Sequence, residues 1–240
     1  VRVALTRPES LCMHPKRHPM TMEMSLGCDK NGKLTFVESD IIGDTGAYAS
    51  VGMKVLERAA GHATSVYSIP IVNIRSRAVY TNNVPCGAMR GFGVNQINFA
   101  IESSIDELCL QGGFDRWQFR YDNALQPGDR TSTGQKINSG IGIQKTLLAV
   151  KEQFNNAKYA GIACGMKNTG IGNGVQDEGK VKVVIESPTE IMIHHGWTEM
   201  GQGVFTMAVQ FLCEATGVNP NFISVKVDTS KDAPCGMTTA

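Results

Sequence analysis

Between Met20 and Asp40 the chain reads MTMEMSLGCDKNGKLTFVESD, and this stretch decides the fold. Apolar and polar residues alternate up to the turn Asp29-Lys30-Asn31-Gly32, and a second run returns from Lys33 to Asp40. A period of two is typical of a strand with one buried face, and Asn-Gly is a favoured two-residue turn. The stretch therefore predicts a β-hairpin.

Further strands and helices follow the hairpin in two groups. Residues 94–111 predict a helix, because Ile97, Ala100, Ile101, Ile105 and Leu108 form one stripe and Gly112-Gly113 can end it. The other predicted elements are a strand from Ile71 to Tyr80, a helix capped by Asp115 to about Leu125, a loop over 126–142, a helix from Ile143 to Asn155, a strand near 159–167, a hairpin of 179–186 with 189–195, a helix from Gly203 to about Thr216 and a strand near 223–228. Strands precede helices twice, which indicates an α+β fold with subdomains over 1–130 and 131–240.

Composition excludes several classes of protein. The 240 residues carry a net charge of only +1, with 42% hydrophobic residues, so neither a nucleic-acid partner nor a membrane partner is indicated. The seven cysteines show no C-x-x-C spacing, and scattered reduced thiols suit a cytoplasmic protein. No signal peptide is visible. Val1-Arg2-Val3 and Thr238-Thr239-Ala240 lack start and stop patterns, so we expect a fragment or one part of a split subunit.

Two glycine-rich junctions are the strongest candidates for a ligand site. Pro85 to Gly93 reads PCGAMRGFG and leads from a strand region into a helix, with Arg90 beside the turn. Gly196 to Gly203 reads GWTEMGQG and again leads from a strand into a helix. Glycine allows a close approach of backbone to ligand, and a helix N-terminus favours an anion. The turns therefore predict a grip on an anionic cofactor, although purely structural turns would use the same residues.

Other patterns carry less information. Gly170-Ile171-Gly172-Asn173-Gly174 lacks the G-x-G-x-x-G spacing, which excludes a dinucleotide fold and leaves either a third ligand turn or a plain β-turn. Glu57-Arg58 on its own is compatible with a solvated helix edge. His194-His195 point to opposite faces of a strand, so no side-chain metal site is expected.

Three separated segments together resemble the molybdenum hydroxylases, the xanthine dehydrogenase and aldehyde oxidase family. They are Glu57-Arg58-Ala59, Ala88 to Gly93 and Thr198 to Gly203, and they occur in the family's order. Weaker matches lie at Arg17-His18-Pro19, around Asn73, at Glu107-Leu108 and at Thr238-Thr239-Ala240. The resemblance spans the chain and implies two α/β sandwich-like subdomains from the middle of the molybdenum-binding portion.

The resemblance also implies roles for individual residues. The catalytic candidates are Glu57 and Arg58, with Arg58 facing a purine-type substrate on whose ring negative charge develops. Phe92, Met89 and Ala88 would contact the substrate, with Phe92 fixing the ring plane. Met89 stands where vertebrate purine enzymes have a second aromatic residue. The implied cofactor ligands are Arg90, Gly91, Gly201, Gln202, Gly203, Thr239 and Ala240.

The implied activity is hydroxylation of a purine or related N-heterocycle, with water as the oxygen source. The implied cofactor is molybdopterin, either plain or as its cytosine dinucleotide, without a side-chain ligand to the metal. Iron–sulfur (2Fe-2S) and FAD groups are expected on other domains or subunits. The family's general-base glutamate has no match here, so we expect the rest of the molybdenum subunit to supply it. The alternatives are an aldehyde- or carbon monoxide-oxidising relative and a non-catalytic pterin-binding module.

Overall fold

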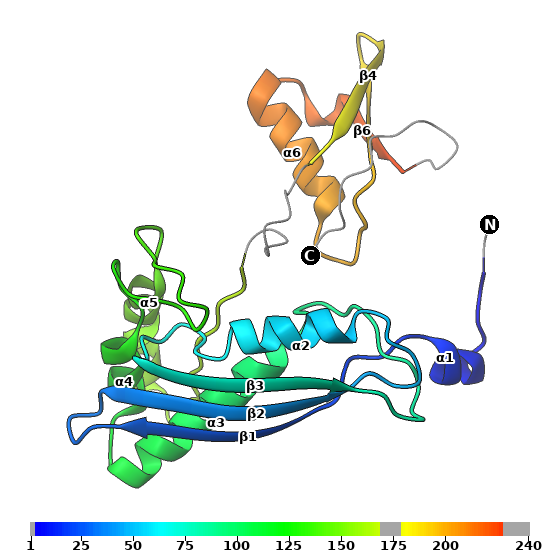
Figure 1. Ribbon diagram of the computed structural model, residues 1–240. Helices are drawn as coiled ribbons and strands as arrows, with labels where there is room; N and C mark the ends of the chain where they lie inside the picture. Colours follow the sequence, from blue (N-terminus) through cyan, green and yellow to red (C-terminus); the bar gives the residue numbers. More distant parts are fainter. Residues whose placement is uncertain (1–2, 169–178, 228–240) are drawn as a thin grey trace. The chain divides into compact units, whose positions relative to one another are not determined.

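The computed structural model describes residues 3–168 and 179–227, and the chain divides into two compact units, Val1–Lys167 and Asn168–Ala240. Each unit contains one three-stranded mixed sheet (Figure 1), so the α+β class is confirmed. The subdomain boundary after residue 130 stays a prediction. Within the described residues, no helix is long and apolar enough to cross a bilayer.

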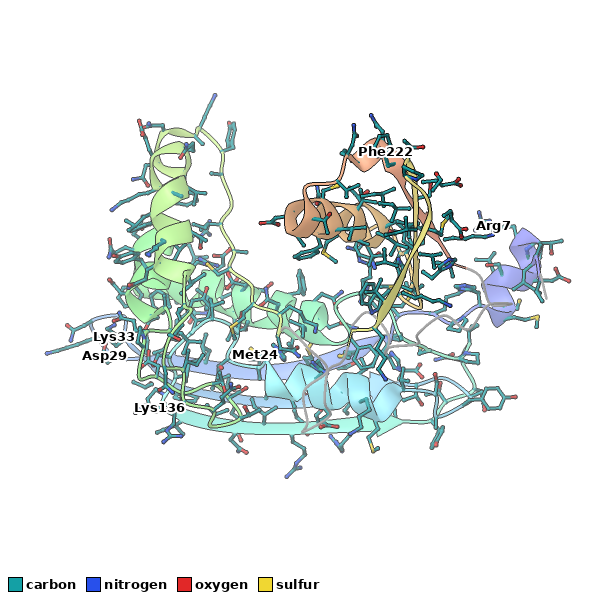
Figure 2. All side chains as sticks on the ribbon, turned by 90° about the horizontal axis from the view of Figure 1, so that it is seen from above. Arg7, Met24, Asp29, Lys33, Lys136 and Phe222 are labelled. Atoms are coloured by element: carbon teal, nitrogen blue, oxygen red, sulfur yellow. The ribbon has the colours of Figure 1, made fainter. Side chains whose placement is uncertain are left out.

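The first unit is built on the predicted hairpin. Its strands β1 (Met20–Cys28) and β2 (Leu34–Asp44) pair antiparallel from Met20↔Gly43 to Cys28↔Leu34. Strand β3 (Ile71–Val79) adds to β2 in parallel. Figure 2 shows Asp29 and Lys33 together at the hairpin tip, where the Asp29 carboxylate accepts from the amides of Asn31 and Lys33. The elements are α1 (Arg7–Met13), β1 (Met20–Cys28), β2 (Leu34–Asp44), α2 (Gly52–Gly61), β3 (Ile71–Val79), α3 (Val94–Gly112), α4 (Arg116–Asn123) and α5 (Ile143–Asn156).

One face of this sheet is covered by α2 and α3. Val37 of β2 packs with Ile101 and Ile105 of α3, and Ile41 packs with residues of α2. The opposite face is polar, with Glu23, Ser25, Glu38, Asp40, Asn73 and Arg75 in neighbouring register positions. The period of two along the hairpin therefore reports a sheet buried on one side, as predicted.

The predicted helix caps are largely confirmed. Asp115 accepts a hydrogen bond from the Gln118 amide at 2.7 Å and caps α4, which ends at Asn123. Gly113 follows α3 at φ 69°, in the left-handed conformation that ends helices. Helix α1 was not predicted; its capping box joins Thr6 and Glu9.

The strand predicted near 159–167 is wrong. Ile162, Cys164 and Met166 do alternate toward the core, but the segment pairs with no strand in the described part of the chain. Its carbonyl at Cys164 accepts instead from the side-chain amide of Asn98 at 2.8 Å. An extended chain packed on helices produces the same alternation as a strand, so periodicity alone cannot separate the two.

A buried ion pair joins the helices behind the sheet. Arg120 of α4 is fully buried and donates from Nε to the Glu102 carboxylate at 2.8 Å, and from Nη2 to Asp106 at 3.0 Å. Tyr67 donates its hydroxyl to the other Glu102 oxygen at 2.5 Å. Burial and the Glu102 charge raise the pKa of Tyr67, which keeps the hydroxyl protonated. This network therefore ties α3, α4 and the segment after α2 together.

The second unit repeats the strand order of the first on a smaller scale. The hairpin around Pro188, the helix ending at Thr216 and the last strand are all confirmed. Strands β4 (Val181–Ser187) and β5 (Glu190–His195) pair antiparallel. After the helix α6 (Val204–Thr216), strand β6 (Ile223–Lys226) adds to β5 in parallel. The elements are β4 (Val181–Ser187), β5 (Glu190–His195), α6 (Val204–Thr216), the short 3-10 helix Pro220–Phe222 and β6 (Ile223–Lys226).

Candidate functional site

The first glycine turn has an unusual backbone. Gly91, Phe92 and Gly93 have successive φ values of 92°, 50° and 97°. A bulky residue with positive φ is strained, and such residues gather at ligand sites. The turn is closed by hydrogen bonds from the Phe92 amide to the Met89 carbonyl at 2.8 Å and from the Val94 amide to the Gly91 carbonyl at 3.0 Å. The predicted start of a helix at this turn is confirmed.

The same turn has backbone donors without an acceptor among the described residues. Ala88, Met89 and Arg90 are exposed, and α3 has no side-chain cap on its N-terminus. Across residues 3–168 and 179–227, the amides of Met89, Arg90 and Gly91 donate to no other residue. Amides without an acceptor, in a turn that carries an arginine and leads into a helix, are suited to an oxyanion such as a phosphate. These residues therefore fit the anionic part of a pterin cofactor.

Helix α2 lies directly against this turn. A Cβ atom on Gly93 would fall 2.2 Å from the Val55 carbonyl oxygen and 3.1 Å from the Ala59 nitrogen. The ring of Phe92 is half-buried and packs against the cluster that contains Val55 and Ala59. The structure thus brings the segment carrying Arg58 together with the turn carrying Phe92, although Phe92 comes 34 positions after Arg58 in the chain.

Arg58 belongs to a group of basic side chains. The ring Nδ1 of His62 lies 3.0 Å from the Arg58 carbonyl oxygen, at the end of α2. Burial lowers the pKa of His62, and the Lys167 and Arg58 charges lower it further. Burial, followed by the Arg58 charge, also lowers the pKa of Lys167. Sequence reasoning missed Lys167, because the residues that precede it in the chain alternate like a strand and no motif marks it.

Glu57 has a different environment from Arg58. Its side chain is exposed and forms an ion pair with Lys54 at 2.8 Å, three residues earlier on α2. An exposed pair of this kind contributes little to stability. The arrangement keeps Glu57 on the solvent side of the helix, whereas Arg58 is half-buried. Their roles in catalysis stay predictions.

The second glycine turn is closed by its own side chains. Glu199 accepts from the amides of Gly201 at 2.7 Å and Gly203 at 3.1 Å, and its other oxygen accepts from Phe205 at 3.4 Å. These bonds lower the pKa of Glu199. Gln202 accepts from the Met200 amide at 2.6 Å and donates to the Thr198 carbonyl at 2.8 Å.

This second turn leaves room for a ligand within the described part of the chain. Gly201 and Gly203 have φ values of 90° and 80°, and no atom of residues 3–168 or 179–227 lies within 4 Å of where a Cβ atom would stand on either. The Gln202 carboxamide is exposed in this open space. The residues therefore fit a neutral hydrogen-bonding contact to a cofactor. Gly170 to Gly174, Thr239 and Ala240, which are also candidates, lie outside the described residues.

Comparison with known proteins covers the whole chain. Residues 1–124 and 138–240 each match a family described as "Molybdopterin cofactor-binding domain". A probable xanthine dehydrogenase subunit of Bacillus subtilis is 34% identical over 100% of this chain and 34% of its own length. The "Nicotinate dehydrogenase large molybdopterin subunit" of Eubacterium barkeri is 40% identical over 64% of this chain and 36% of its own length.

A solved structure agrees with these sequence relationships. The aldehyde oxidoreductase from Desulfovibrio gigas superposes with a TM-score of 0.79 at 28% identity, over 88% of this chain and 25% of that chain. The chain spans about a third of the length of the two curated relatives. With the first family match extending over more than half of its residues, the chain belongs to the molybdopterin cofactor-binding domains of the molybdenum hydroxylase large subunit.

Proposed function

We propose that this chain forms the substrate-facing part of a molybdenum hydroxylase that oxidises a purine or related N-heterocycle. The observation that carries the proposal is the contact of α2 with the Gly91-Phe92-Gly93 turn, which places the helix end carrying Arg58 beside that turn. Relatives whose names specify xanthine and nicotinate are 34% and 40% identical to the chain. Both names refer to nitrogen heterocycles, which favours the same substrate class here.

The proposed cofactor contacts divide by charge. Arg90 and the amides around Gly91 would hold an anionic group of molybdopterin, whereas Gln202 between Gly201 and Gly203 would make a neutral hydrogen bond. Thr239 and Ala240 complete the proposed set. When bound, molybdopterin supplies the redox chemistry that the side chains lack. The 2Fe-2S and FAD groups, the rest of the molybdenum subunit and a cytoplasmic location are further parts of this proposal.

The remaining residues would act on the substrate. Phe92 would fix the plane of the heterocycle, and its position in the strained turn is maintained by packing against α2. Arg58 would stabilise negative charge as it develops on the ring nitrogen or oxygen, and a fixed cation in a partly buried position does this without reorganisation. Met89 and Ala88 would border the ring. Glu57, on the exposed side of α2, would act with Arg58 as the second catalytic residue.

Replacement of Arg58 with methionine tests the substrate assignment. In the complete enzyme, we expect kcat/KM for a purine to fall by about 10²–10³-fold, because one charge-stabilising group at the transition state contributes that much. Turnover of an aldehyde, which develops no ring oxyanion, should change less than about threefold, by the same reasoning. Steady-state kinetics on both substrates would measure the difference.

A matched control removes a positive charge elsewhere. Lys30→Met, in the exposed hairpin turn, should leave both substrates unaffected. Equal losses for purine and aldehyde in Arg58→Met would contradict the assigned role and favour the aldehyde-oxidising alternative. Metal and pterin analysis of the purified complete protein tests the cofactor itself: bound pterin without turnover of any substrate would favour a non-catalytic binding module.

A further inference from the structure

Glu199 occupies the place where a bound anion would sit at the N-terminus of α6. Its two carboxylate oxygens take up the amides of Gly201, Gly203 and Phe205. A helix N-terminus with free amides attracts an anion, but here the chain provides one of its own. The first turn differs, because no carboxylate of the described residues accepts from the amides of Met89, Arg90 and Gly91, and Arg90 adds a positive charge to this turn. The two glycine turns are therefore electrostatically different.

The Glu199 bonds determine the shape of the loop that carries Gln202. They join the loop to the helix on both sides of Gln202, at Gly201 and at Gly203. The loop entrance is fixed as well, since the Trp197 amide donates to Nδ1 of the buried His195 ring at 3.1 Å. Between these two sets of bonds, the Gln202 side chain folds back onto its own loop: it donates to the Thr198 carbonyl and accepts from the Met200 amide.

We propose that Glu199 is a positioning residue for Gln202: by holding the amides on either side, it presents the Gln202 carboxamide to the cofactor and keeps other anions off α6. This inference rests on the proposed cofactor contact of Gln202. It assigns a neutral contact to the Gln202 turn, because the carboxylate of Glu199 already occupies the helix N-terminus. Glu199 itself would not touch the cofactor.

The test measures how fast the pterin leaves the complete purified protein. We expect Glu199→Ala to release pterin at least about tenfold faster than wild type, which corresponds to losing one hydrogen bond of ordinary strength. Glu199→Gln should stay within about threefold, because its carbonyl oxygen can still accept from Gly201 and Gly203. Glu214→Ala, the matched control at the exposed far end of α6, should behave as wild type.

A double variant separates positioning from general stability. If Glu199 acts through Gln202, then Glu199→Ala combined with Gln202→Ala should release pterin no faster than Gln202→Ala alone. Additive effects, or a Glu199→Ala variant that behaves as Glu214→Ala, would overturn the inference. Should Glu199→Ala fail to fold, Glu199→Asp takes its place, since a side chain one methylene shorter moves the carboxylate away from the Gly201, Gly203 and Phe205 amides. Wild-type retention of pterin in that variant overturns the inference.

The outcome also separates this inference from the proposed function. A wild-type protein that carries no pterin would overturn both proposals. A wild-type protein that carries pterin and releases it at the same rate as Glu199→Ala would overturn only the role of Glu199. Hydrogen exchange of the Gly201, Gly203 and Phe205 amides gives a second readout, with faster exchange expected in Glu199→Ala and near-native exchange in Glu199→Gln.

Discussion

Replacement of Gly93 with alanine is expected to destabilise the first unit by about 2–5 kcal/mol, the sum of a left-handed backbone penalty and overpacking against a neighbour. Gly93 has a φ of 97°, where an L side chain is strained. A Cβ atom there would lie 2.2 Å from the Val55 carbonyl oxygen, which belongs to a helix backbone and cannot rotate away. Helix α2 would therefore have to separate from the turn.

The chain offers a clean way to measure this effect. Of its two tryptophans, Trp117 is buried in the first unit and Trp197 belongs to the second. In a Trp197→Phe background, urea unfolding followed by tryptophan fluorescence reports on the first unit alone. Because α2 carries Arg58, we also expect the variant in the complete enzyme to lose pterin or activity beyond what the stability change explains.

Gly113→Ala is the matched control. Gly113 has a φ of 69°, but no atom of the described residues lies within 4 Å of the position of its Cβ atom. It should therefore cost only the backbone part of the penalty, about 1–2 kcal/mol. Equal destabilisation by the two substitutions would show that the close approach of α2 to Gly93 adds nothing to the free-energy cost of Gly93→Ala.

Replacement of Arg120 with methionine is expected to destabilise the first unit by about 3–5 kcal/mol, because breaking a buried pair leaves an uncompensated charge. The side chain of Arg120 is 0% exposed and that of Glu102 is 8% exposed. Without the guanidinium, the Glu102 carboxylate would keep only the Tyr67 hydroxyl as its side-chain partner among the described residues. The same tryptophan fluorescence assay measures the loss.

Two further variants distinguish a charge effect from lost packing. Glu102→Leu combined with Arg120→Met should be less destabilised than Arg120→Met alone, since no charge is then left buried. Asp106→Asn should cost less than about 1 kcal/mol, because that side chain is 41% exposed and water screens its ion pair. A double variant at least as unstable as Arg120→Met would contradict the charge argument.

Local patterns were enough to predict most elements of both units. The Asp29–Gly32 turn, the Asp115 cap and the left-handed glycine after α3 each act within a few residues, so the sequence specifies them directly. The parallel addition of β3 to β2 was not predictable in this way. Strand pairing depends on which edges meet after the chain has folded, and no residue near Ile71 encodes that partner.

The residues of the candidate site also fall into two groups, those that the sequence indicated and those that only the structure revealed. The motifs around Arg58, Phe92 and Gln202 are visible in the sequence, and the family match confirms the family that they indicate, while the roles of the three residues stay predictions. The sequence did not indicate that Glu199 would close the second turn, because its bonds depend on the three-dimensional course of that loop. Lys167 was missed for the same reason, since its neighbour Arg58 lies more than a hundred residues earlier.

The two glycine turns have the same interpretation in the sequence, as grips on an anion, and the sequence alone determined that each would open a helix. Only the tertiary structure decided that they differ. At Gly93 the absent side chain allows two helices to touch, while the amides before it have no acceptor among the described residues. At Gly203 a carboxylate from the same loop already fills the helix N-terminus. A motif specifies backbone freedom, but the groups that occupy the resulting space come from the folded chain.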